Sequence, residues 1–63
     1  MPIVKIDMLE GRSEEQKNKL FREVTDAIVR TIDARPESVT IILNEQPLVN
    51  LGKAGKPLAE TMK

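Results

Sequence analysis

The feature that most constrains this sequence is its shortness, combined with the absence of cysteine and histidine. A single domain of 63 residues buries only about 60% of the surface that its unfolded chain exposes. Chains of this size usually need disulfides, a bound metal or partner subunits for stability, and the missing side chains remove most of the first two. A hydrophobic content of 40% argues against disorder. We therefore expect the chain to assemble with other subunits.

The same missing side chains narrow the possible chemistry. Ser-His and Cys-His pairs, histidine acid-base catalysis and zinc fingers all need residues that this chain lacks. Ten basic and ten acidic residues give a formal net charge of zero, and a single Phe cannot build a base-stacking surface, so no nucleic acid partner is expected. No stretch approaches the roughly 20 apolar residues of a membrane span, and the first residues lack the long apolar region of a signal peptide. A cytoplasmic protein without a membrane partner is expected.

Hydrophobic spacing predicts a strand over residues 2–9. The segment alternates with the period of two that is typical of a half-buried strand. Its two predicted faces are an apolar one with Val4, Ile6 and Met8 and a polar one with Lys5 and Asp7.

A capping signal and an apolar stripe predict a long helix after this strand. Ser13, followed three residues later by Gln16, is typical of a capping box at a helix start. Pro36 disfavours helical backbone at the residue before it, so the helix is predicted to end near Asp33. The predicted buried face carries Leu20, Phe21, Val24, Ala27, Ile28, Thr31 and Ile32.

A second strand and a C-terminal segment complete the chain. Residues 38–44 are rich in β-branched side chains and lie between Pro36 and Pro47, so they are predicted as a strand. Strand, helix and strand make an α/β fold of β-α-β type with parallel strands. Residues 47–63 are predicted as an extended arm or small hairpin that wraps a neighbour. The chain, residues 1–63, is expected to be one domain, and the sheet face without a helix again predicts an oligomer.

Pro2 is a candidate catalytic residue because it follows the initiator Met. A small residue at this position permits removal of Met1, which would expose the secondary amine of Pro2. A prolyl amine whose pKa is lowered towards neutrality by burial and nearby cations is suited to proton transfer at pH 7. A Met-Pro start taken alone favours a plain structural role, so the rest of the sequence has to decide.

A longer pattern accompanies this proline. It comprises Pro2-Ile3-Val4, the segment Met8-Leu9-Glu10-Gly11-Arg12-Ser13-Glu14-Glu15-Gln16-Lys17, Arg22-Glu23-Val24, Ala27-Ile28, Ser38-Val39, Ile41-Ile42 and Glu45. In these residues the chain resembles the 4-oxalocrotonate tautomerase family, without gaps from Pro2 to about Leu58. The Leu-Glu-Gly-Arg-Ser segment after an N-terminal proline strand is a specific combination.

The resemblance implies a cofactor-independent isomerase with a tautomerase fold. Subunits would assemble as a homo-hexamer, a trimer of dimers, with the amino group of Pro2 as the general base. The implied reaction is keto-enol tautomerisation of 2-hydroxymuconate, or a similar small 2-hydroxy dienoate of aromatic catabolism, to a conjugated 2-oxo acid. Arg12 matches an arginine that binds a substrate carboxylate, a task that suits the always charged, bidentate guanidinium. The alternative for Arg12 is a surface residue before the helix cap. Neither a metal nor another cofactor is expected.

Two positions depart from the family pattern. Thr40 stands where the family has a second arginine, which reaches the substrate's other carboxylate and carbonyl oxygen from a neighbouring subunit, and Leu51 stands where it has an aromatic pocket residue. Loss of a charge-assisted bond to a developing enolate costs about two to four kcal/mol of transition-state stabilisation. Leu51 keeps the pocket apolar. Lys5, Arg35 or Lys53 of an adjacent subunit are candidates to replace the arginine, although a solvated surface charge is the preferred interpretation of each.

The departure at Thr40 leaves other interpretations open. A substrate with a single carboxylate needs no second arginine. In a hetero-hexamer another subunit would supply the arginine, and this chain would be a catalytically weak or inactive assembly subunit. A related proline-based dehalogenase or hydratase would need a water-activating carboxylate near Pro2, and spacing alone does not assign that role to Asp7 or Glu10.

Overall fold

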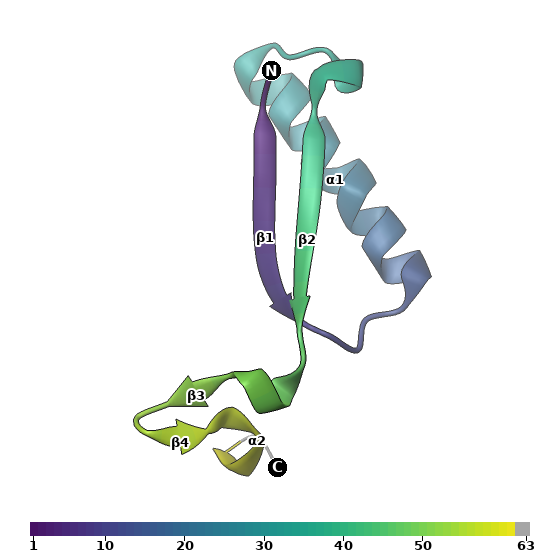
Figure 1. Cartoon of the computed structure of the whole chain (residues 1–63). Coiled ribbons are helices and arrows are strands. Elements are labelled where there is room, and N and C mark those ends of the chain that lie inside the picture. Colours follow the sequence, from purple (N-terminus) through teal and green to yellow (C-terminus); the bar gives the residue numbers. More distant parts are fainter. Residues whose placement is uncertain (62–63) are drawn as a thin grey trace.

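The computed structural model describes residues 1–61 as two parallel strands that lie side by side, with one long helix across one face (Figure 1). Strand β1 spans Ile3–Leu9, helix α1 spans Glu14–Ile32 and strand β2 spans Thr40–Gln46. The strands pair in parallel from Ile3 opposite Thr40 to Leu9 opposite Gln46. The predicted β-α-β unit is confirmed.

Both predicted ends of α1 are confirmed by their cap geometry. The hydroxyl oxygen of Ser13 accepts the backbone N–H of Gln16 at 3.1 Å, and the side-chain oxygen of Gln16 accepts the backbone N–H of Ser13 at 2.9 Å. This reciprocal capping box satisfies two N–H groups that a helix start leaves without partners. At the other end Asp33 adopts the left-handed conformation, with φ at 57°, and terminates the helix.

The second strand begins later than its composition predicts. Ser38 belongs to a short 3-10 turn, Pro36–Ser38, and β2 starts at Thr40 and continues past Asn44 to Gln46. The turn forms because the backbone N–H and the hydroxyl of Ser38 both donate to the carbonyl of Arg35, each at 2.9 Å. These local bonds compete with the sheet ladder for a segment whose β-branched residues begin only at Val39.

Only one face of the two-stranded sheet is covered by α1. Exposure alternates along β1: Val4, Ile6 and Met8 are half-buried, whereas Ile3, Lys5 and Asp7 are exposed. On α1 the half-buried apolar residues are Leu20, Val24, Ala27, Ile28 and Val29. Thr31, predicted on the buried face, is exposed near the end of the helix. Phe21 and Ile32, also predicted there, remain exposed as well. Phe21 and Ile32 lie at one side of the apolar face of α1. This face is wider than a sheet of two strands can cover.

The described part of a single chain has no buried core. No hydrophobic residue there is fully buried, and Ile3, Ile32 and Val49 are 62%, 61% and 78% exposed. The radius of gyration is 15.0 Å, whereas a compact chain of this length would have about 11 Å. A flat subunit of this kind cannot bury its apolar surface by itself. Burial of that surface against other subunits is the physical reason to expect assembly.

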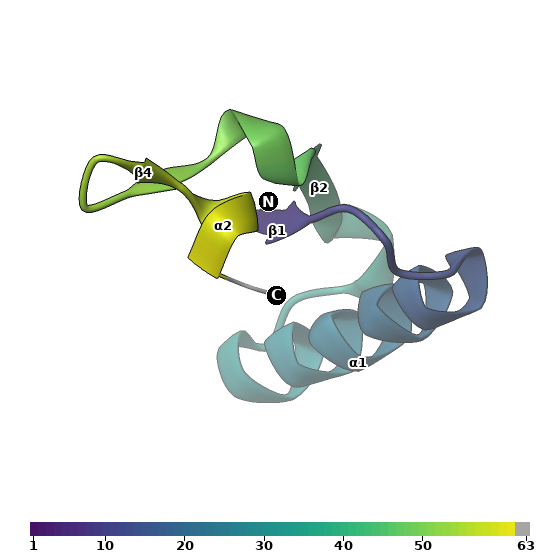
Figure 2. The same ribbon diagram turned by 90° about the horizontal axis from the view of Figure 1, so that it is seen from below.

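The C-terminal segment projects away from the β-α-β unit as a small hairpin (Figures 1 and 2). It comprises the 3-10 turn Leu48–Asn50, strands β3 (Gly52–Lys53) and β4 (Lys56–Pro57), and the short helix α2 (Leu58–Thr61). The hairpin prediction is confirmed, and the wrapping of a neighbour stays a prediction. Residues 62 and 63, the end of that predicted segment, lie outside the described residues. Within residues 1–61 no helix is long and apolar enough to cross a membrane.

Candidate active site

Pro2 and Thr40 lie side by side at the N-terminal edge of the sheet. The backbone N–H of Thr40 donates to the carbonyl oxygen of Pro2 at 3.0 Å, immediately before the two strands enter their parallel register. Pro2 is half-buried and Thr40 is exposed. The backbone of Pro2 is therefore held in place by the sheet, which gives its nitrogen a defined position at the edge of the subunit.

Arg12 lies at the opposite end of the same strand. All seven residues of β1, followed by Glu10 and Gly11, separate it from Pro2, and the strand alone spans roughly 23 Å in extended backbone. Gly11, with φ at 120°, makes the turn from β1 towards α1, and the capping box fixes the residue that follows Arg12. The Arg12 side chain is exposed, and no carboxylate among residues 1–61 forms an ion pair with it. Its guanidinium is available to an anionic ligand.

Leu51 is on the same side of the subunit as Arg12. The residue follows the C-terminal end of β2, which in a parallel pair lies at the same edge as the C-terminal end of β1. Leu51 is half-buried, donates its backbone N–H to the carbonyl of Leu48 at 3.2 Å, and accepts the N–H of Leu58 at 2.9 Å. These bonds hold an apolar side chain at the base of the hairpin.

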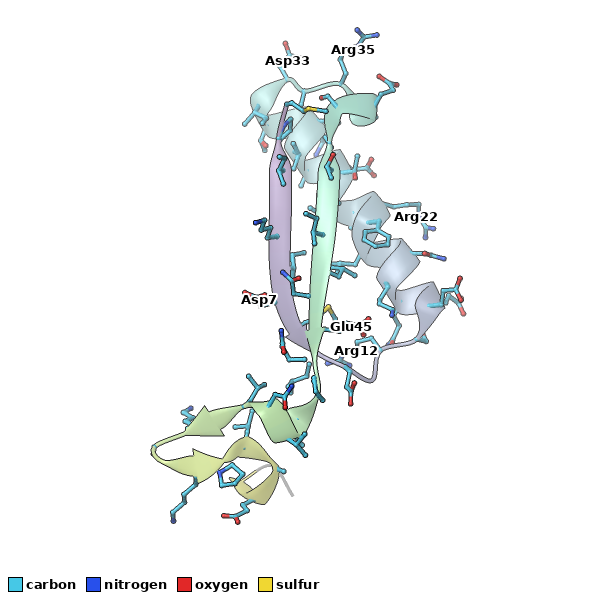
Figure 3. The ribbon with its side chains drawn as sticks, in the orientation of Figure 1. Asp7, Arg12, Arg22, Asp33, Arg35 and Glu45 are labelled. Carbon is cyan, nitrogen blue, oxygen red and sulfur yellow. The ribbon has the colours of Figure 1, made fainter. Side chains whose placement is uncertain are left out.

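One chain therefore brings the four predicted site residues together only in pairs. Pro2 lies with Thr40 at one edge of the sheet, and Arg12 and Leu51 lie towards the other. Figure 3 shows Arg12 at the end of β1 that is far from the N-terminus. A proton-transfer group and a carboxylate anchor at opposite ends of a strand roughly 23 Å long cannot serve one small molecule. If all four act in one site, the Arg12 side must come from another copy.

The surroundings of Arg12 include an ion pair that no sequence pattern predicts. Nζ of Lys17 on α1 lies 2.8 Å from Oε1 of Glu45 on β2, and the side chains are 27% and 30% exposed. Lys17 and Arg12 share an open hollow of about 240 Å³ with Met8, Gln16 and Leu20. The two ionic partners are 28 positions apart, so no local spacing reveals the pair. Only the resemblance, which includes both residues, carried a signal.

The three cations considered as replacements for the missing arginine lie in different places. Lys5 is exposed on β1 and Lys53 lies in β3 of the hairpin, whereas Arg35 lies beside the start of β1 at the Pro2 edge (Figure 3). Arg35 borders an open hollow of about 340 Å³ together with Met1, Glu37 and Ser38. Of these three cations, Arg35 is thus the one that lies at the Pro2 edge of its own chain.

The two carboxylates considered for water activation lie away from Pro2 in their own chain. Asp7 is five residues further along an extended strand, roughly 16 Å. Glu10 follows β1 and donates its backbone N–H to the carbonyl of Gln46 at 3.0 Å, at the opposite edge. Among residues 1–61 no group of three acidic side chains is arranged to hold a metal ion.

Comparison with known proteins identifies the family of the chain. The family model described as "Tautomerase enzyme" matches residues 2–61, which include Pro2, Arg12, Thr40 and Leu51. The chain belongs to the 4-oxalocrotonate tautomerase family. It is 52% identical to the 2-hydroxymuconate tautomerase of Stutzerimonas stutzeri over 56 residues, covering 89% of each chain.

Solved structures of the tautomerase family share the fold. A 4-oxalocrotonate tautomerase isozyme from Methylibium petroleiphilum is 40% identical, with 95% of this chain and 94% of that chain covered and a TM-score of 0.88. A heterohexamer 4-oxalocrotonate tautomerase from Chloroflexus aurantiacus J-10-fl is 37% identical, with 95% and 97% covered and a TM-score of 0.86. As a member of this family the chain is an isomerase with tautomerase activity.

Proposed function

We propose that this tautomerase converts 2-hydroxymuconate, or a similar small 2-hydroxy dienoate, into its conjugated 2-oxo acid, with Pro2 as the general base. The observation that carries the proposal is Pro2 held by the Thr40 N–H at a sheet edge, in a chain 52% identical to a 2-hydroxymuconate tautomerase. A role in aromatic catabolism in the cytoplasm is part of the same proposal.

The proposed reaction moves one proton within the substrate. Removal of Met1 leaves the Pro2 nitrogen as a secondary amine with a basic lone pair. The amine accepts the proton of the 2-hydroxyl group as the carbon–oxygen bond becomes a carbonyl, and the same proton returns to a carbon of the diene. Arg12 binds a carboxylate of the substrate, which it can do bidentately because its guanidinium is unpaired in the described chain. Substrate and product contain the same atoms and electrons, so the isomerisation needs no cofactor.

The proposed site is shared between subunits of a hexamer. Support comes from the separation of Pro2 from Arg12, from the absence of a buried core in the described chain, and from the solved heterohexamer among the relatives. A second copy placed against the uncovered sheet face would bury Ile3 and Ile42 and bring its own Arg12 and Leu51 to the first copy's Pro2. Leu51 would contribute an apolar wall. We propose a homo-hexamer, a trimer of dimers.

Ultraviolet-monitored ketonisation of 2-hydroxymuconate tests the proposal. Protein whose mass confirms the loss of Met1 should turn the substrate over rapidly. Pro2→Ala should lower kcat by about 10²- to 10⁴-fold without changing the oligomer, because the general base is altered. A form with an N-terminal extension, in which the Pro2 nitrogen stays in a peptide bond, is the matched control and should be equally slow. Full activity of either form would contradict Pro2 as the base.

A second candidate function follows from Thr40, which carries no charge. The chain would then be a weakly active or inactive assembly subunit that needs a partner subunit. A relative from Chloroflexus aurantiacus J-10-fl is a heterohexamer, so mixed assemblies occur among similar proteins. A pure oligomer of this chain with rapid, Pro2-dependent turnover would exclude that role. Turnover that appears only after a partner chain from the native source co-assembles would favour it over the homo-hexamer.

A further inference from the structure

The Pro2 edge of the subunit contains a cationic residue, Arg35, whose backbone is held in place by the fold. Arg35 borders an open hollow of about 340 Å³ together with Met1, Glu37 and Ser38 (Figure 3). Met1 is bonded to the Pro2 nitrogen and lines this hollow, so its removal opens the hollow further and leaves the nitrogen beside the space that Met1 occupied. Arg35 borders that space, where a small organic acid could reach both groups.

Backbone hydrogen bonds tie Arg35 to Pro2. Pro36 keeps Arg35 in extended backbone, with φ at −82° and ψ at 140°. The Arg35 carbonyl accepts two hydrogen bonds from Ser38, through its backbone N–H and its hydroxyl, each at 2.9 Å. Two residues later the N–H of Thr40 donates to Pro2 at 3.0 Å. The turn that carries Arg35 is therefore built onto the start of β1.

The guanidinium of Arg35 is available for a ligand. Its one ion pair among the described residues is to Glu37, with 3.7 Å between Nε and Oε2, and the two side chains are 88% and 77% exposed. A solvent-exposed pair at this distance contributes little. It also leaves the paired terminal nitrogens of Arg35 free to bind a carboxylate in the bidentate geometry that guanidinium favours.

We propose that Arg35 is a second carboxylate-binding residue of the Pro2 site and that it supplies the positive charge absent at Thr40. This inference rests on the proposed function, because it assigns a substrate class to that site: small dicarboxylic enol acids held by Arg35 of one copy and Arg12 of another. It replaces the sequence-based interpretation of Arg35 as a solvated charge. Glu37 pairs with Arg35 when no substrate is bound, and the substrate carboxylate has to displace it.

Binding of adipate, an unreactive six-carbon dicarboxylate, tests the assignment without depending on turnover. Calorimetry on the Met1-free oligomer should show Arg35→Gln weakening adipate binding about ten- to hundredfold, as expected for the loss of a bidentate charge-assisted contact. Arg35→Lys should recover part of the loss. Arg22→Gln, the same change on the outer face of α1, is the matched control and should bind as the parent does (Figure 3).

A second variant changes binding in the opposite direction. Glu37→Gln removes the competing carboxylate and should tighten adipate binding a few-fold while leaving the fold intact, because the side chain is highly exposed. In turnover assays Arg35→Gln should raise KM for 2-hydroxymuconate far more than it lowers kcat.

Unchanged adipate affinity in Arg35→Gln would overturn the assignment of Arg35. Failure of the proposed tautomerisation would instead appear as parent turnover that does not depend on Pro2, with adipate still bound through Arg35.

Discussion

The ammonium group of Lys17 and the carboxylate of Glu45 form an ion pair with 2.8 Å between Nζ and Oε1. The pair joins the first turns of α1 to the far end of β2, and it lies next to the capping box that follows Arg12. Its side chains are only 27% and 30% exposed, so solvent screens it less than the exposed Arg35–Glu37 pair. The contact holds the Arg12 end of the helix against the sheet.

Breaking this pair should therefore destabilise the fold. Lys17→Met leaves the Glu45 carboxylate without its partner and should lower the free energy of unfolding by about 1–2 kcal/mol. Urea unfolding at one fixed protein concentration measures the change. Lys19→Met removes the same charge from an exposed position of α1 and should have little effect. Equal stability of the two variants would show that the ion pair contributes nothing.

The capping box makes a separate prediction about the start of α1. Ser13→Ala removes the acceptor of the Gln16 N–H and should cost about 1 kcal/mol, the usual contribution of an N-cap side chain. Ser13→Thr retains an oxygen in the same place and should keep most of the stability. Thermal unfolding followed by circular dichroism compares the three proteins. A loss as large in the threonine variant as in the alanine variant would argue against the cap as its cause.

The tip of the hairpin offers a place to gain stability. Ala54 and Gly55 both have positive φ, 55° and 80°, which is the conformation of a type I′ hairpin turn. Alanine is strained in this conformation, so Ala54→Asn should increase the free energy of unfolding by about 1 kcal/mol. The midpoint of thermal unfolding should rise accordingly. Gly55→Ala should lower it by a similar amount through backbone strain alone, because a Cβ at that position meets no atom within 4 Å. Unchanged midpoints in both variants would contradict the strain.

Local sequence patterns predicted most of the secondary structure of the subunit. The capping pair Ser13 and Gln16, the proline that ends the helix and the alternation along β1 depend on neighbours within four residues, and each is confirmed. The start of β2 was wrong by two residues because the hydrogen bonds of Ser38 to Arg35 are invisible to strand propensity. Phe21 and Ile32 were wrongly placed on the buried face because the sequence does not give the width of the sheet.

The candidate site was less predictable for a geometric reason. Sequence and resemblance named Pro2, Arg12, Thr40 and Leu51, but only the fold shows that one subunit holds them in two separate pairs. The placement of Arg35 beside Pro2 depends on a parallel strand pairing between residues nearly 40 positions apart in the chain. No local pattern around Arg35 contains that information, which is why its charge was interpreted as solvated.

The uncovered sheet face predicts the effect of a charge on assembly. Ile42 is 39% exposed on this face, in register with Lys5. Ile42→Lys should prevent association and yield smaller, unstable species, because a lysine cannot be buried in an apolar interface without a partner. Ile42→Val keeps the surface apolar and should assemble as the parent does. Sedimentation velocity distinguishes the two, and an intact oligomer of the lysine variant would place the interface elsewhere.

The separation of Pro2 from Arg12 along β1 makes a prediction about mixed oligomers. Pro2→Ala and Arg12→Ala proteins should each be nearly inactive, because every site of either oligomer lacks one group. If a site takes the two residues from different copies, unfolding the two proteins together and refolding them should create sites that contain both native residues, about a quarter of the total with random mixing. Activity should therefore reappear only after co-refolding, and simple mixing of folded oligomers is the control. Native mass spectrometry verifies that both variants are present in one assembly. An inactive mixture with confirmed co-assembly would show that the two residues do not serve one site from separate subunits.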